Sequence, residues 1–222
     1  MLDMKWEDFK KCLEKCAACR DNTSRELIDN NARPLFGKFR PISRGLLFVF
    51  EAPNRDDTYN PSKGYITVNA ETDPSGTFLY ELANRAFGCH PETLQIVNSV
   101  LCLPTERNGD RPVSGYQRRL CTENLRQQIT ILDPTVVVPL GVQPLKALDY
   151  VCQHGISRIS EGVAKSVKWM GRWLFPLYHT SKQARYGPTG RKPERQHSDW
   201  SELRKFTEDL QEYEHKQHLQ KA

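Results

Sequence analysis

The chain has 222 residues, of which 38% are hydrophobic and 27% are charged, and its formal net charge is +5. A chain of this length forms one large domain or two small ones. Folding buries roughly 70% of the unfolded surface, so the core does not depend on disulfides or metal ions. The longest apolar runs, residues 46–50 and 136–141, are far shorter than the roughly 20 residues of a membrane span, and the charged N-terminus argues against a signal or transit peptide. We therefore expect a single cytoplasmic domain over residues 1–222 that has no contact with a membrane.

Four apolar runs predict buried strands. Gly45–Glu51, Leu94–Val100 and Thr135–Leu140 are continuous apolar segments, which are typical of strands covered on both faces. Trp173–Tyr178 is the fourth, and a short strand near Val167 is a further candidate.

Helical patterns separate these strands. Apolar residues at helical spacing run from position 75 to Gly88, which suits a C-cap, and further helices are predicted at 115–132, at 143–151 and from 198 to about 218. Strands that alternate with helices predict a three-layer α/β/α sandwich around a central, mainly parallel four-stranded sheet.

Polar segments follow the first, second and fourth predicted strands. They begin at Glu51, Asn98 and His179 and are rich in acids, amides, arginines, Pro and Gly. Because ligands of such sheets bind beyond the carboxyl ends of the strands, the sequence predicts the functional site at this edge.

Seven cysteines in a reducing compartment are expected to be thiols or metal ligands rather than disulfides. Cys16 and Cys19 form a C-x2-C pair, Cys102 directly follows the second strand, and Cys121 lies on the apolar face of the next helix. Four such thiolates can bind an iron-sulfur cluster or a structural zinc ion. The spacing does not match a zinc ribbon, so a cluster is favoured over zinc, and four unliganded core thiols are the structural alternative.

Four features occur in a defined order: the C-x2-C pair, the tripeptide EAP after the first strand, an Asn four residues before a Cys, and a strand that ends in His. Together they resemble the uracil-DNA glycosylase superfamily, specifically its iron-sulfur-containing family 4 type, from about Cys16 to Arg185. The resemblance implies an enzyme that flips a modified pyrimidine out of DNA and hydrolyses its N-glycosidic bond, leaving an abasic site. It also implies that Cys16, Cys19, Cys102 and Cys121 hold a structural 4Fe-4S cluster.

The resemblance assigns catalytic roles to three residues. His179 would donate a hydrogen bond to the pyrimidine oxygen on which negative charge develops. Glu51 or Asp57 would stabilise the cationic sugar or position the attacking water, as carboxylates do in glycoside hydrolysis. A buried core histidine and solvated loop acids are the alternatives without function.

Three further residues are expected to bind the flipped base. Asn98 offers a donor and an acceptor for the pyrimidine edge, Ala52 belongs to the EAP motif, and Tyr65 could stack on the flipped base. A side chain that satisfies a local turn is the alternative for Asn98.

DNA is the expected partner, and a monomer is the expected state of the protein. The basic, loop-like segment after His179 is predicted to contact the phosphates through Lys182, Gln183, Arg185 and Arg191, and Lys182 or Gln183 would fill the gap that the flipped base leaves. The alternative is a solvated surface, and the terminal helix is expected only to pack.

The segment from Asn60 to Gly76 departs most from the family pattern, because it is lengthened and lacks the family's stacking Phe. This favours, as a second hypothesis, a glycosylase for a bulky hypermodified pyrimidine in foreign or viral DNA, with an antiviral role. A metal-stabilised protein that binds DNA or senses damage without catalysis is the alternative from another class.

Overall fold

The computed structural model describes residues 2–14, 23–24, 45–52, 58–60, 65–67, 73–90, 93–104 and 113–219. Its described strands are β1 (Thr23–Ser24), β2 (Leu46–Phe50), β3 (Thr58–Asn60), β4 (Tyr65–Thr67), β5 (Gln95–Asn98), β6 (Leu103–Pro104), β7 (Val136–Pro139), β8 (Val167–Trp169) and β9 (Arg172–Leu174). Its described helices are α1 (Leu2–Glu14), α3 (Pro74–Phe87), α4 (Gly115–Leu120), α5 (Thr122–Leu132), α6 (Val142–Val151), α7 (Ile159–Gly162), α8 (Lys182–Tyr186) and α9 (Pro193–Leu219).

The centre of the fold is a five-stranded sheet in the order β5-β2-β7-β9-β8. The first four strands are parallel to their neighbours, and β8 pairs antiparallel with β9 at the edge. Two small ribbons, β1-β6 and β3-β4, lie outside this sheet. The α/β sandwich is confirmed, and its sheet has one more strand than the four predicted, because the candidate near Val167 forms β8.

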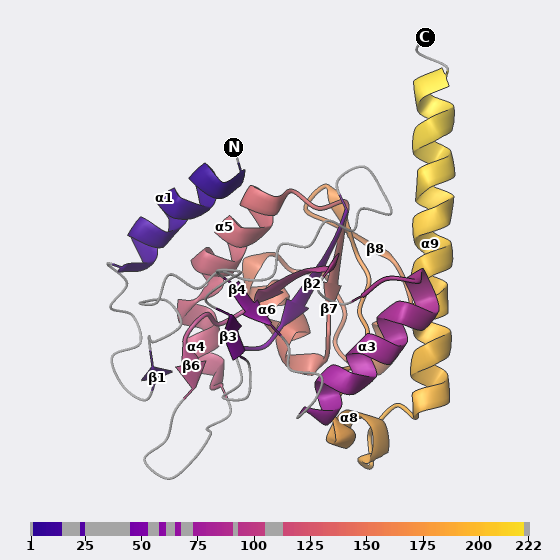
Figure 1. Ribbon diagram of the computed structural model, residues 1–222, viewed down its shortest axis with the longest axis horizontal. Helices are drawn as coiled ribbons and strands as arrows, with labels where there is room; N and C mark the ends of the chain where they lie inside the picture. Colours follow the sequence, from indigo (N-terminus) through magenta and orange to yellow (C-terminus); the bar gives the residue numbers. More distant parts are fainter. Residues whose placement is uncertain are drawn as a thin grey trace.

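Residues along β2 alternate between the two faces of the sheet, as the period of two in a strand requires. Leu46 and Phe48 pack with α3 and α9, whereas Leu47 and Val49 pack with α5 and α6. Figure 1 shows these helices on opposite sides of the sheet, with α9 as the long outermost element. Both faces of β2 are therefore buried, in agreement with its continuous apolar sequence.

Helix α3 confirms the predicted element and its C-cap. Gly88 ends the helix with φ 61°, in the left-handed region that favours glycine. The carboxylate of Asp73 accepts hydrogen bonds from the backbone N–H groups of Ser75 and Gly76 and so caps the first turn.

The fourth predicted strand is shorter than expected. β9 ends at Leu174, and one isolated bridge follows between Leu177 and Leu140. The N–H groups of Phe175 and Leu177 still donate to the carbonyls of Val137 and Pro139, so the pairing with β7 continues past the end of β9.

Two predicted helices have different bounds. The helix expected over 115–132 is divided at Cys121 into α4 and α5, and Ser114 and Gln117 form a capping box at the start of α4. The terminal helix begins at Pro193 rather than near 198, because proline is well suited to the first helical position. No described helix is long and apolar enough to cross a membrane.

Candidate functional site

The carboxyl ends of β2 and β5 are joined by hydrogen bonds. The carbonyl of Phe50 accepts from the N–H of Ser99 at 2.8 Å, and the carbonyl of Glu51 accepts from the N–H of Val100 at 2.9 Å and from the Ser99 hydroxyl at 2.7 Å. Asn98 pairs with Phe50 in the parallel register. These contacts fix the segments that carry Glu51 and Asn98 side by side.

His179 follows β9 at the same edge of the sheet, and its ring meets Phe50 edge-on at 6.0 Å between ring centres. Its Nδ1 accepts a hydrogen bond from the N–H of Ser181 at 3.1 Å. A nitrogen that accepts cannot carry the proton, so the neutral ring is protonated on Nε2.

Burial lowers the pKa of His179, and the negative charge of Asp73 opposes this effect only in part. The imidazole is therefore neutral at pH 7 and presents one N–H group, on Nε2. A donor with a fixed tautomer in a protein-lined position can stabilise an oxyanion.

Gly141 lies directly behind His179. Its φ is +103°, and a Cβ added there would lie 3.1 Å from the Cβ of His179. The backbone N–H of Gly141 also donates to the carbonyl of Leu177 at 2.8 Å. The position thus requires glycine both for its backbone conformation and for the close approach of the histidine.

Glu51 is held by an arginine that the sequence analysis did not single out. Nη1 of Arg118 lies 3.1 Å from Oε1 of Glu51 and also donates to the carbonyl of Val113 at 2.7 Å. Arg118 is 8% exposed. Burial raises the pKa of Glu51, and the charge of Arg118 and its hydrogen bond oppose that rise. The sequence carried no signal for Arg118, because a charged residue of an amphipathic helix is expected on the exposed face.

The other predicted base-pocket residues are only partly described. Ala52 packs against Val100, Val113 and Cys121 at the end of β2. The backbone carbonyl of Asn98 accepts from Gln128 at 3.0 Å, and Asn98 is half-buried. Tyr65 begins β4, and its side chain lies outside the described part of the structure. Asp57 lies entirely outside the described residues.

A cavity of about 730 Å³ opens beside His179 on the side of α6. It extends between the N-terminus of α6, the segment 154–160 and the loop around α8, and its lining includes the cations of Lys146 and Arg158. Asp149 also lines it, and this carboxylate accepts from the N–H of His154 at 3.1 Å. Glu51 and Asn98 do not line this cavity, so it is distinct from the edge where they meet.

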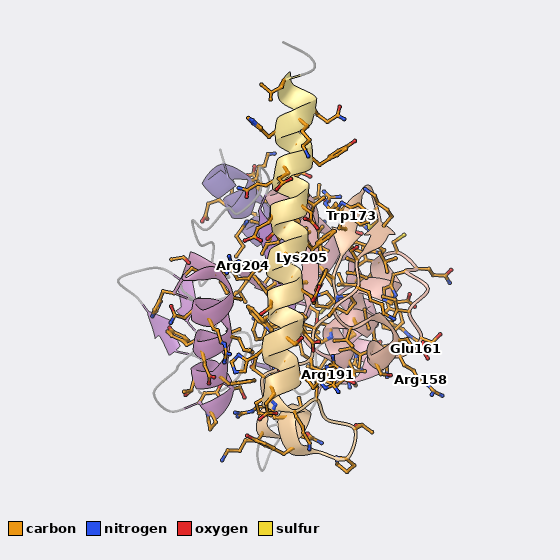
Figure 2. All side chains as sticks on the ribbon, turned by 90° about the vertical axis from the view of Figure 1, so that its right-hand side faces the viewer. Arg158, Glu161, Trp173, Arg191, Arg204 and Lys205 are labelled. Carbon is orange, nitrogen blue, oxygen red and sulfur yellow. The ribbon has the colours of Figure 1, made fainter. Side chains whose placement is uncertain are left out.

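The four predicted DNA-contact residues have different surroundings. Lys182 and Gln183 are exposed on α8. The guanidinium of Arg185 lies 4.7 Å from the ring centre of Phe78 and donates to the carbonyl of Pro74 at 3.3 Å. Arg191, visible at the lower end of α9 in Figure 2, pairs with Asp199 through Nε at 2.7 Å and Nη2 at 2.5 Å. Whether any of them contacts DNA stays a prediction.

Tyr186 was missed by the sequence analysis. It ends α8 and is 69% exposed, with the guanidinium of Arg185 5.6 Å from its ring centre. Its place seven residues after His179, in the basic segment, is the signal that could have identified it.

The predicted cluster ligands are divided between described and undescribed parts. Cys121 is buried and Cys102 is half-buried, whereas Cys16 and Cys19 lie outside the described residues. Within the part that the structure describes, no three His, Cys, Asp or Glu side chains gather as a metal site. This finding does not test a site that includes Cys16 and Cys19.

The chain matches a known protein family over most of its length. A sequence model described as the uracil DNA glycosylase superfamily matches residues 36–204. The chain therefore belongs to the uracil-DNA glycosylase superfamily, whose members are hydrolases that act on DNA. No curated protein matches the chain.

Proposed function

We propose that this protein is a monofunctional DNA glycosylase that hydrolyses the N-glycosidic bond of uracil or of another modified pyrimidine and leaves an abasic site. One observation carries the proposal: His179 is held as a neutral Nε2–H tautomer at the sheet edge where Glu51 and Asn98 meet, in a chain of this superfamily.

His179 stabilises the leaving group in this proposal. When the bond between C1′ and N1 breaks, both electrons remain on the pyrimidine, and negative charge develops on its ring oxygens. The Nε2–H group donates to the oxygen next to N1, while the Ser181 N–H bond to Nδ1 keeps the ring from rotating or changing tautomer. Such a preorganised donor contributes about 3 kcal/mol to transition-state stabilisation.

Glu51 acts on the sugar side of the same bond. The departing base leaves an oxocarbenium-like sugar, to which water adds through a new bond between its oxygen and C1′ while its proton leaves. The carboxylate held by Arg118 stabilises the cation or accepts that proton. Asp57 is a further candidate for this role, Asn98 reads the pyrimidine edge, and Ala52 and Tyr65 complete the base pocket.

The cavity beside His179 receives the sugar-phosphate backbone. In a pyrimidine nucleotide, the oxygen at position 2 is adjacent to N1, so a residue that binds it lies next to the deoxyribose. The cavity adjoins His179, and its lining includes Lys146 and Arg158, which supply cations for phosphates. Lys182, Gln183, Arg185 and Arg191 remain further candidates for contacts with the DNA.

The decisive experiment is a base-release assay. Duplex and single-stranded oligonucleotides that contain uracil, a thymine mismatch or modified cytosines are incubated with the protein, and abasic sites are then cleaved with alkali. We expect strand cleavage with at least one substrate and its loss in His179→Asn. Absence of cleavage with every substrate, together with retained binding to abasic DNA, would instead support a non-catalytic damage sensor.

We further propose that the protein is of the iron-sulfur-containing family 4 type, with a structural 4Fe-4S cluster bound by Cys16, Cys19, Cys102 and Cys121. The chain on both sides of the C-x2-C pair is anchored near Cys102. Leu13 packs in one cluster with Leu101 and Cys102, and Thr23 pairs with Pro104 in the β1-β6 ribbon.

Chain connectivity supports this ligand set. Cys16 is three positions after Leu13, and such a stretch spans at most about 10 Å. Cys121 packs against Val100, two residues before Cys102. The described residues therefore fit a site in which the N-terminal segment is tied to the strand end next to the base pocket.

Metal content tests the cluster directly. We expect about four iron ions per chain and a broad visible absorption band, both lost in Cys102→Ser. The matched control is Cys152→Ser, which changes an exposed cysteine far along the chain. Stoichiometric zinc in a colourless protein would contradict the cluster.

One observation favours the second candidate substrate, a bulky hypermodified pyrimidine. The β3-β4 hairpin lies in the chain between Ala52 and the α3 cap, Asp73. Such an insert beside the first motif is suited to reshape the pocket around the base. Faster release of a glucosylated or otherwise enlarged cytosine than of uracil would identify this substrate class and favour a role in defence against foreign DNA.

A further inference from the structure

The loop from His179 to Arg191 is held at both ends by one buried side chain of α9. Gln196 is 1% exposed, and its Nε2 donates to the carbonyl of Arg191 at 2.9 Å and to the carbonyl of His179 at 3.4 Å. The two ends of the loop, twelve positions apart in the sequence, are thereby fixed relative to each other.

A second residue of α9 holds the same loop by charge. Asp199 is 3% exposed and binds the guanidinium of Arg191 through two hydrogen bonds. A bidentate pair of this kind fixes the direction of the arginine as well as its position. Arg191 thus uses two of its donors inside the protein, at the lower end of α9 in Figure 2.

The loop passes this restraint on to the histidine ring. The N–H of Arg191 donates to the carbonyl of Ala184 at 2.7 Å, and the N–H of Ala184 donates to the Ser181 hydroxyl at 3.3 Å. Ser181 in turn supplies the N–H that binds Nδ1 of His179.

Close packing leaves this loop little freedom. A Cβ at Gly187 would lie 2.5 Å from the carbonyl oxygen of Gln183, and one at Gly190 would lie 2.9 Å from that of Ala184. A shift at Arg191 is therefore transmitted through α8 instead of being absorbed locally.

We propose that Gln196 and Asp199 are positioning residues that set the orientation and tautomer of His179 through the His179–Arg191 loop. This inference rests on the proposed glycosylase function. It gives α9, which the sequence analysis assigned only to packing, a role in the reaction.

The test uses Gln196→Met, which keeps the side-chain length but removes the donor, and Asp199→Asn, which removes the charge. Single-turnover rates are measured at saturating protein with DNA that contains uracil or 5-fluorouracil. We expect a roughly ten- to hundredfold loss with uracil. The loss should be smaller with 5-fluorouracil, because this better leaving group depends less on the donor.

Glu208→Gln is the matched control. Glu208 pairs with Arg204 on the same helix at 2.7 Å, but this pair is exposed. The control should retain the wild-type rate for both bases. Unchanged rates in both test variants, or equal losses for the two bases, would overturn the proposal.

A second readout does not require catalysis. In ¹⁵N-labelled protein, the ring nitrogens of His179 should show the Nε2–H tautomer, and the two variants should show mixed tautomers while Glu208→Gln does not. If the wild-type protein releases no base, the glycosylase proposal fails, and this spectrum still decides whether α9 positions the ring. A wild-type tautomer in both variants would refute the positioning role.

Discussion

Arg118 reaches Glu51 across 67 positions of the chain, and their side chains meet at 3.1 Å where α4 passes the end of β2. Arg118 is buried, whereas the Glu51 side chain is 34% exposed. The carboxylate at the proposed reaction centre is thus bound by a buried arginine and remains partly exposed to solvent.

Removing this arginine should change the pH dependence of the reaction. Burial raises the pKa of Glu51, and Arg118 opposes that rise, so Arg118→Met should raise the pKa of Glu51 further. If the ionised carboxylate is required, the acidic limb of the pH–rate profile moves to higher pH. The variant should also lose about 2 kcal/mol of unfolding free energy, because polar groups remain buried without their partner.

Arg119→Gln is the control for this variant. Arg119 is the next residue, but it is exposed and stacks on Tyr150. We expect its pH–rate profile to match that of the wild type. An Arg118→Met profile with an unshifted acidic limb would contradict the role of the pair.

His179 should titrate below its ordinary range. Because burial lowers its pKa below 6.5, NMR of the ring at pH 6.5 should show more of the neutral form than of the protonated form. The pKa is lower in the folded than in the unfolded state, so the stabilising contribution of neutral His179 is complete above pH 6.5 and is lost as the pH falls through the folded-state pKa. A ring midpoint at 6.5 or above would contradict this prediction.

Substitution of His179 should affect chemistry more than folding. His179→Asn should reduce the single-turnover rate by about 10²- to 10³-fold, as for other removed oxyanion donors. Its thermal midpoint should stay within a few degrees of the wild type. If the thermal midpoint falls by much more than a few degrees along with the rate, His179 has a structural role instead.

Gly141→Ala should displace the side chain of His179. The added Cβ meets the Cβ of His179 at 3.1 Å, and φ of +103° is strained for alanine, at a cost of about 1–3 kcal/mol. Gly171→Ala is the matched control, because Gly171 has φ of +71° and no atom within 4 Å of the added Cβ. Both variants should lose stability, and only Gly141→Ala should lose most of its activity. Equal activities would exclude the close contact as a functional constraint.

The cavity cations should contribute to DNA affinity through phosphates. We measure binding to abasic duplex DNA as a function of salt concentration. In each of the variants Lys146→Gln and Arg158→Gln, the slope of log affinity against log salt concentration should become shallower by about 0.9. Lys168→Gln is the control, because Lys168 lies over Trp173 at the β8 edge. Unchanged slopes in both cavity variants would place the DNA backbone elsewhere.

Periodicity in the sequence was sufficient to predict the frame of the site. The apolar runs that form β2 and β5 predict parallel buried strands, and parallel strands bring the residues at their carboxyl ends to one edge. This is why Glu51 and Asn98 could be placed together before their hydrogen-bonded segments were seen.

Contacts between distant polar residues could not be predicted in the same way. The Arg191–Asp199 pair depends on where α9 begins, and the residues before Pro193 have the composition of a loop. The Arg118–Glu51 pair depends on α4 turning a charged residue inward, which hydrophobic patterning treats as a surface position. Local propensity fixes neither of these, because tertiary packing decides which polar groups meet.

The position of the β3-β4 hairpin suggests how substrate range in this lineage can diversify. The hairpin lies between Ala52, which packs against the end of β5, and Asp73, which caps α3. Both attachment points contact residues outside the hairpin. Under the proposed glycosylase function, insertions or exchanges in the hairpin can accumulate while His179, Glu51 and Asn98 keep their frame, and recognition of new bases can then evolve separately from bond cleavage.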